Sequence, residues 1–137
     1  NAILDFDDAI KLNPKSAEGF YNRGLAKAKL GRYEAAIEDY SEASRLNPKD
    51  PEPPFNRGLA YLSQGKYDYA ARDFSEVIRI RPNNADAHIY RGIMRIYQGK
   101  EKDGEVDFQK AFQINPALKK KLQPLIDEAK AKAKGKP

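Results

Sequence analysis

The 137-residue sequence contains no cysteine, no tryptophan, one histidine and one methionine. Without cysteine the chain forms no disulfide, no thiolate zinc site and no cysteine nucleophile, and one histidine excludes a site built from several imidazoles. No apolar run approaches the roughly 18 residues that a membrane-spanning helix needs. No phosphate-binding loop or catalytic triad is present, and His88 occupies a slot that an aromatic residue fills elsewhere. We therefore expect no metal, no cofactor, no membrane span and no enzyme.

Most of the chain has no excess of positive or negative charge. The net charge of +5 and the isoelectric point of about 9.3 at first favour a nucleic acid or an anionic membrane as partner. Seven lysines against two acidic residues in 119–137 account for that whole excess, so residues 1–118 are neutral. Lysines without interleaved aromatic residues touch phosphates but read no bases. A nucleic-acid partner, bound through this Lys-rich segment, is therefore the least favoured function.

A period of 34 residues organises the sequence. It relates four prolines: Pro14, Pro48, Pro82 and Pro116. It also relates two sets of glycines: Gly24, Gly58 and Gly92, and Gly31, Gly65 and Gly99. Within the first full unit, Ser16 is a candidate N-cap and apolar residues at helical spacing predict one helix before Gly31 and a second before Pro48. The pattern predicts a tandem array of helical hairpins.

The residues at the recurrent positions resemble those of the tetratricopeptide repeat (TPR) family. In the first unit they are Phe20, Arg23-Gly24, Lys27, Ala36, Tyr40 and Pro48. The resemblance implies an all-α, right-handed helical-hairpin solenoid forming one domain over 1–134. Its expected parts are the second helix of a truncated repeat (1–16), repeats at 17–50, 51–84 and 85–118, a capping helix (119–134) and a tail (135–137).

Departures from the family pattern lead to further expectations. Gly104 replaces a packing alanine, so the third repeat is expected to pack more loosely. Leu118, Leu122, Ile126 and Ala129 lie at helical spacing and predict a helix that covers the last apolar face. Pro124 lies inside that helix, which predicts a late start or a kink.

Arginine replaces the usual leucine before the first glycine in all three repeats, and an aspartate precedes each arginine by 18 residues. We expect these residues to pair as Asp5 with Arg23, Asp39 with Arg57 and Asp73 with Arg91. Asp107 would then be left without a partner. The alternative is an arginine stripe that binds an acidic ligand.

The family resemblance places the first helix of each repeat along a concave groove. The residues it implies for peptide binding are Tyr21, Asn22, Leu25, Lys29, Phe55, Asn56, Leu59, Leu62, Ile89, Tyr90, Ile93 and Tyr97. An exposed aliphatic row at Leu25, Leu59 and Ile93 needs a partner, and asparagines can hydrogen-bond a peptide backbone. Two alternatives remain: the aromatic and Asn positions are scaffold, or neighbouring helices and the C-terminal segment cover the row.

The favoured function is a protein-interaction module, acting as adaptor or scaffold, that binds an extended or helical segment of a partner protein. The subclass that clamps acidic chaperone tails is not expected, because only Asn56 matches its clamp and Asp86 repels a carboxylate. The runner-up is self-association through the first helix, or continuation of a longer array. The chain begins at Asn1 without Met and is interpreted as a fragment, with a cytoplasmic location favoured.

Overall fold

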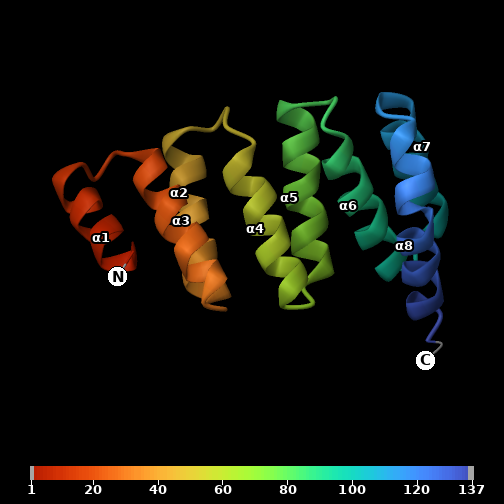
Figure 1. Cartoon of the computed structure of the whole chain (residues 1–137), viewed down its shortest axis with the longest axis horizontal. Coiled ribbons are helices and arrows are strands. Elements are labelled where there is room, and N and C mark those ends of the chain that lie inside the picture. Colours follow the sequence, from red (N-terminus) through yellow and green to blue (C-terminus); the bar gives the residue numbers. More distant parts are fainter. Residues whose placement is uncertain (1, 136–137) are drawn as a thin grey trace. The chain divides into compact units, whose positions relative to one another are not determined.

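The computed structural model of the protein describes residues 2–135. Over that range it contains eight α-helices and no strand (Figure 1), so the predicted all-α helical-hairpin class is confirmed. The helices are α1 (Ala2–Leu12), α2 (Ala17–Lys29), α3 (Tyr33–Leu46), α4 (Glu52–Ser63), α5 (Tyr67–Ile80), α6 (Ala85–Tyr97), α7 (Glu101–Ile114) and α8 (Ala117–Ala133).

The helices form two compact units, with α1–α4 in unit 1 and α5–α8 in unit 2. The division lies between Lys66 and Tyr67, so the two helices of the predicted repeat 51–84 belong to different units. The single domain over 1–134 stays a prediction.

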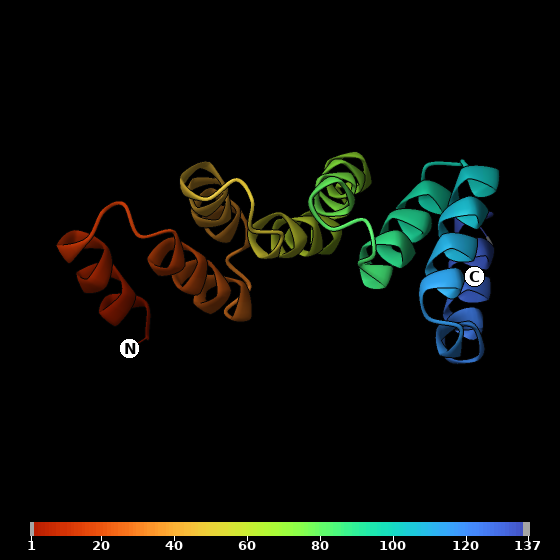
Figure 2. The same ribbon diagram turned by 90° about the horizontal axis from the view of Figure 1, so that it is seen from above.

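In unit 1, α1 and α2 are joined by a short turn (Figure 2), and α2 packs on α3 in the same hairpin manner. Ser16 caps α2 as predicted, because its Oγ accepts a hydrogen bond from the Gly19 N–H at 3.1 Å. The close crossing of α2 and α3 requires Gly24, since a Cβ there would lie 2.7 Å from the ring of buried Tyr40. Gly31 follows the end of α2 and has a φ of 76°. A Cβ there would meet no atom within 4 Å, so the backbone conformation alone favours glycine.

Unit 2 repeats the crossing more tightly. A Cβ at Gly92 would lie 2.5 Å from the ring of Phe108, and one at Gly104 would lie 2.7 Å from the carbonyl oxygen of Gly92. The prediction that Gly104 loosens this repeat is therefore wrong. The missing methyl group lets the two backbones approach each other instead of leaving a gap.

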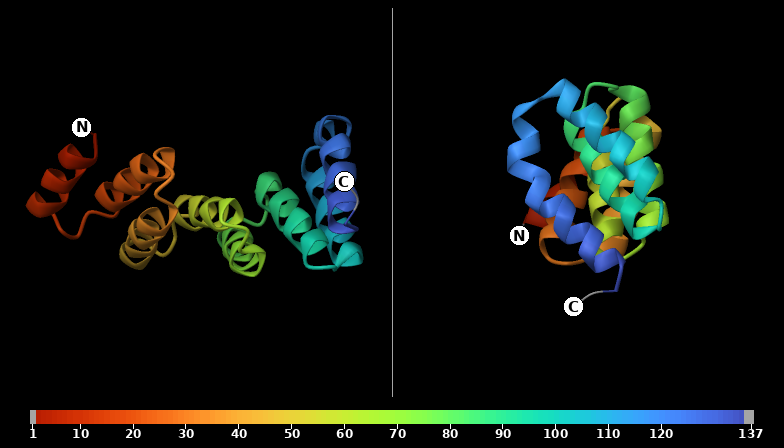
Figure 3. Two further views of the ribbon diagram at one scale, coloured as in Figure 1. Left: turned by 90° about the horizontal axis from the view of Figure 1, so that it is seen from below. Right: turned by 90° about the vertical axis from the view of Figure 1, so that its right-hand side faces the viewer.

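The last helix, α8, packs against α6 and α7 (Figure 3). Its Ile126 and Ala129 are buried in a cluster with Ile89, Ile96 and Phe108, and Leu118 and Leu122 pack against that cluster. The helix begins at Ala117, two residues before the predicted start, and continues through Pro124 to Ala133. The expected late start is wrong, because Pro116 precedes the helix and its carbonyl accepts from the Lys119 N–H.

Candidate functional site

The recurrent arginines cross-link neighbouring helices. Arg23 on α2 donates from Nε and Nη2 to the two carboxylate oxygens of Asp39 on α3, at 2.9 and 2.7 Å. Its Nη1 donates to Asp7 on α1 at 2.6 Å. The hydrogen bond to Asp39 raises the pKa of Arg23 above its ordinary value, although partial burial acts in the opposite direction. One guanidinium thus fastens three helices.

The same arrangement recurs in unit 2. Arg91 on α6 donates from Nε and Nη2 to Asp107 on α7 at 3.1 and 2.8 Å, and from Nη1 to the Ser75 hydroxyl on α5 at 3.2 Å. Arg95 adds a second contact to Asp107, at 2.8 Å. In unit 1, Arg57 donates to the Ser41 hydroxyl at 3.0 Å.

These contacts correct the predicted ion pairs. Arg23 pairs with Asp7 and Asp39, and not with exposed Asp5. Asp39 pairs with Arg23 and Lys27, and not with Arg57. Arg91 pairs with Asp107, and not with Asp73. Asp107, which was expected to lack a partner, is buried between two arginines. The aspartate faces the arginine of its own hairpin, 16 residues before it, because the tight glycine crossing brings those two helices together. The 34-residue period fixes which helix carries each residue but not which neighbour it faces.

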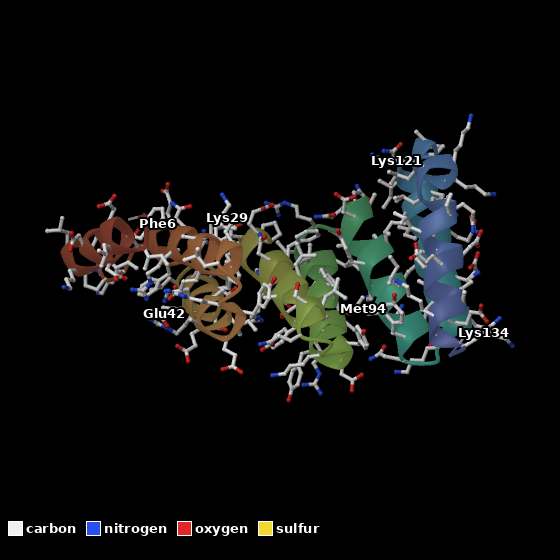
Figure 4. All side chains as sticks on the ribbon, turned by 60° about the horizontal axis from the view of Figure 1, so that its bottom comes forward. Phe6, Lys29, Glu42, Met94, Lys121 and Lys134 are labelled. Carbon is white, nitrogen blue, oxygen red and sulfur yellow. The ribbon has the colours of Figure 1, made fainter. Side chains whose placement is uncertain are left out.

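Three predicted groove residues line a cavity in unit 1. The cavity, of about 590 Å³, lies between α1 and α2, and its walls are Ile3, Phe6, Asn22, Leu25, Ala26, Lys29 and Leu30. Figure 4 marks Phe6 on α1 and Lys29 on α2. Five of the seven side chains are apolar, and Asn22 and Lys29 are the two polar ones. We call this space the α1/α2 cavity.

The sequence interpretation missed four of these lining residues. Ile3 and Phe6 lie on the first helix, for which the sequence suggested self-association, and the sequence placed Ala26 and Leu30 in no site. Apolar residues at helical spacing on both α1 and α2 were the available signal. Their convergence depends on the angle of the hairpin, which periodicity does not give.

Other predicted groove residues of unit 1 hold the scaffold together. The Tyr21 hydroxyl accepts a hydrogen bond from Asn56 Nδ2 at 3.0 Å and donates to Glu52 at 3.5 Å. Burial, followed by the nearby Glu52 carboxylate, raises the pKa of Tyr21. Asn56 Nδ2 also donates to the Glu52 carbonyl oxygen, so both of its N–H groups are used. Asn22 differs, because within residues 2–135 its side chain makes no hydrogen bond.

The remaining groove positions fall on two helices. On α4, Phe55, Leu59 and Leu62 are half-buried. On α6, Ile89 is buried in the core cluster and Ile93 and Tyr97 pack against it, beside α8. Tyr90 stacks on Phe74 with ring centres 5.2 Å apart. In unit 2, therefore, the C-terminal helix covers the apolar row, which is the alternative that the sequence left open.

Some kinds of site are absent from the described chain. Between residues 2 and 135 no three His, Asp or Glu side chains converge in a way that could hold a metal ion. Over the same residues no helix is long and apolar enough to cross a membrane. His88 is buried, with Nε2 placed 2.9 Å from the Pro82 carbonyl oxygen.

Comparison with known families decides the assignment. Two models described as tetratricopeptide repeat match residues 6–38 and 55–84, and one described as TPR repeat matches residues 27–65. Together they span residues 6–84, more than half of the chain. The chain belongs to the tetratricopeptide repeat family. No curated protein matches the TPR chain significantly.

Solved structures of other TPR proteins are similar to this TPR chain. A crystal structure of MamA is 26% identical with a TM-score of 0.81, over 86% of this chain and 69% of MamA. The second TPR of Spaghetti (RPAP3), bound to the HSP90 peptide SRMEEVD, is 29% identical with a TM-score of 0.70, over 78% of this chain and 99% of that one. YrrB, a TPR protein with an unusual peptide-binding site, is 27% identical with a TM-score of 0.72 over 81% of this chain, which spans 57% of YrrB.

Proposed function

We propose that the chain is a protein-interaction module, an adaptor or scaffold rather than an enzyme, that holds a helical segment of a partner protein in the α1/α2 cavity. The observation that carries the proposal is an open space of about 590 Å³ walled by Phe6, Leu25 and Leu30, with polar side chains at Asn22 and Lys29. Apolar walls with a few polar groups are typical of binding sites.

The internal repeat favours a helix as the occupant. Phe6, Asn22 and Leu25 of the cavity correspond, 34 residues later, to Tyr40, Asn56 and Leu59. At those later positions α2 itself is the neighbour: Gly24 of α2 lies against Tyr40, and Tyr21 of α2 accepts from Asn56. The chain therefore contains its own example of a helix on the equivalent surface.

The same comparison specifies the chemistry of the partner helix. A glycine is needed where the helix crosses Phe6, as Gly24 is needed over Tyr40. A hydroxyl or carbonyl group one turn away would accept from Asn22, and an acidic residue would meet the exposed Lys29. Two similar TPR proteins, RPAP3 and YrrB, are described by their peptide binding, which supports the general class of function.

The test uses a labelled peptide of residues 16–30, the segment that contains α2, as the probe helix. Its fluorescence anisotropy is measured against the wild-type chain and the Leu25→Asp variant. Losing apolar contact and burying a carboxylate costs about 1.5–3 kcal/mol, so we expect at least about tenfold weaker binding. A second peptide carrying Gly24→Leu is expected to bind more weakly to the wild type, since its larger side chain meets Phe6.

Leu12→Asp is the matched control, because it makes the same substitution at a residue that is 88% exposed and outside the cavity. It is expected to bind the probe like the wild type. Equal affinity of the Leu25→Asp variant and the wild type, with helicity unchanged by circular dichroism, would exclude this cavity as the site.

A further inference from the structure

We propose that unit 2 carries a second binding site, specific for a phosphate monoester, in a polar cavity between α5 and α6. The cavity has a volume of about 520 Å³. Its charged and hydroxyl-bearing walls are Asp68, Arg72 and Ser75 from α5, Arg91 and Arg95 from α6, and Lys100 at the start of α7. We call it the α5/α6 cavity. It shares no lining residue with the α1/α2 cavity.

The charge of this cavity favours an anion. Four cationic side chains line it against the single carboxylate of Asp68. Asp107 does not line the cavity, but it pairs with Arg91 and Arg95. Counting both aspartates, four positive and two negative charges leave a net charge of +2. Asp68 itself accepts a hydrogen bond from Gln98 Nε2 at 2.6 Å. A concave surface with an excess of one sign concentrates the opposite charge.

Some N–H donors of the cavity bind other side chains of the chain, and others are available to a ligand. Arg91 donates from Nε and Nη2 to Asp107 and from Nη1 to Ser75. Arg95 donates to Asp107 only from Nη1, and its Nε and Nη2 have no acceptor within residues 2–135. Arg72 is exposed, with its guanidinium 5.6 Å from the centre of the Tyr69 ring. Arg72, Arg95 and exposed Lys100 are therefore the groups that would hold the ligand.

The repeat shows that the excess of positive charge is particular to this cavity. Moving back 34 residues, Arg91 and Lys100 correspond to Arg57 and Lys66, which have the same charges. Arg72 and Arg95, by contrast, correspond to Glu38 and Tyr61, and Asp68 corresponds to Glu34. The equivalent lining set in unit 1 therefore has two cations and two carboxylates, against four cations and one carboxylate in the α5/α6 cavity. Arg95 also holds Asp107, as Lys27 holds Asp39 two repeats earlier, so only its Nε and Nη2 are left for a ligand. Arg72 has no such carboxylate partner within residues 2–135, and ligand recognition is its proposed role.

The net charge and the volume together indicate the ligand. A phosphate monoester carries roughly −1.5 to −2 charge at neutral pH and three strong acceptor oxygens, which match a net charge of two and three available cationic groups. A single carboxylate would leave the cavity positively charged. The space exceeds that of an inorganic ion, so the group bearing the phosphate also enters. Its source is either a phosphorylated side chain of a protein or a small phosphorylated molecule.

The experiment titrates the chain, at constant ionic strength, with inorganic phosphate, glycerol 3-phosphate and a short phosphoserine peptide. Arginine side-chain NMR signals report on Arg72 and Arg95 directly. The test variant is Arg72→Glu, which installs the residue that unit 1 has at the same position and leaves the contact between Arg95 and Asp107 in place. We expect saturable shifts of those two signals and at least tenfold weaker binding by the variant.

Arg79→Gln is the matched control, since Arg79 lies on the same helix but pairs with Glu76 outside the cavity. It is expected to keep affinity within twofold of the wild type. Tighter binding of the phosphoserine peptide than of glycerol 3-phosphate assigns the site to a protein partner, and the reverse order assigns it to a small molecule. The absence of saturable binding by any of the three probes, or equal loss in the Arg79→Gln control, overturns the proposal.

Discussion

At the residue scale, the buried aspartates give the repeats their most specific contacts. Asp107 is only 2% exposed and accepts hydrogen bonds from both Arg91 and Arg95. A buried carboxylate is tolerated because its charge is compensated and each of its oxygens receives a donor. Asp39 has an equivalent arrangement with Arg23 and Lys27. The arginine that stands where the family usually has leucine thus has a structural partner in its own hairpin.

Asp107→Ala is expected to destabilise the chain by about 3–5 kcal/mol, since it leaves two half-buried guanidinium groups without a carboxylate. In a double-mutant cycle with Arg91→Ala, measured by urea unfolding, the coupling energy should reach about 1 kcal/mol or more. The same cycle between Arg91 and Asp73, the pair suggested by sequence spacing, should give a smaller coupling. Coupling near zero for Asp107 and Arg91 would contradict the observed pairing.

At the element scale, the crossings of α2 with α3 and of α6 with α7 each depend on one glycine facing one large ring. Gly24 and Gly92 allow the rings of Tyr40 and Phe108 to lie against the backbone of the first helix. The helix that ends unit 2 follows a similar logic, because Ile126 fills the surface left by α6 and α7. Its neighbour Leu125 points away and is 53% exposed.

The pair Ile126 and Leu125 provides a test of the role of α8. Ile126→Ala removes a fully buried side chain and is expected to cost about 2–4 kcal/mol, while Leu125→Ala should cost less than about 0.5 kcal/mol. Thermal unfolding followed by circular dichroism measures both. Similar costs for the two variants would mean that α8 does not stabilise unit 2.

The sequence predicts the helices well because each is marked locally. Ser16 marks the start of α2, and Gly31, Gly65 and Gly99 mark the turns that follow α2, α4 and α6. The partners of the arginines were wrong, because an 18-residue step and a 16-residue step both join neighbouring helices and only the crossing angle distinguishes them. Only three of the seven residues that line the α1/α2 cavity were predicted, because the angle between α1 and α2 determines which side chains converge there. The helical spacing of Ile126 and Ala129 correctly predicted that the last helix covers the final apolar face, but not which residues of α6 it buries.

At the scale of the whole molecule, buried tyrosines make the stability of unit 1 depend on alkaline pH. Unit 1 contains two tyrosines with a raised pKa. Burial raises the pKa of Tyr40 to about 12, and burial together with Glu52 raises the pKa of Tyr21. A raised pKa in the folded state means that folding favours the neutral phenol. The stability that follows is complete below the ordinary value of about 10 and is lost as the pH rises through about 12.

Unit 1 is therefore expected to lose structure between about pH 10 and pH 12, as Tyr40 ionises. Phenolate absorbance and circular dichroism recorded across this range should show the last tyrosine ionising together with loss of helix. Tyr40→Phe keeps the buried ring and removes the ionisable hydroxyl, so the midpoint of helix loss should move to higher pH. Tyr69→Phe, at a side chain that is 51% exposed, is the control and should leave the midpoint unchanged. An unchanged midpoint in the Tyr40→Phe variant would show that this phenol does not set the alkaline limit.

The arginine cross-links have a consequence for how such a chain can grow. Arg23 and Arg91 each bind one residue 16 positions before and one 16 positions after themselves. A gene duplication that adds 34 residues supplies a new arginine together with both of its partners, and leaves the existing links intact. An insertion that is not a whole number of repeats, placed in a helix between an arginine and one of its partners, shifts the two out of register. The hydrogen bonds of the recurrent arginine thus favour changes of chain length by whole repeats.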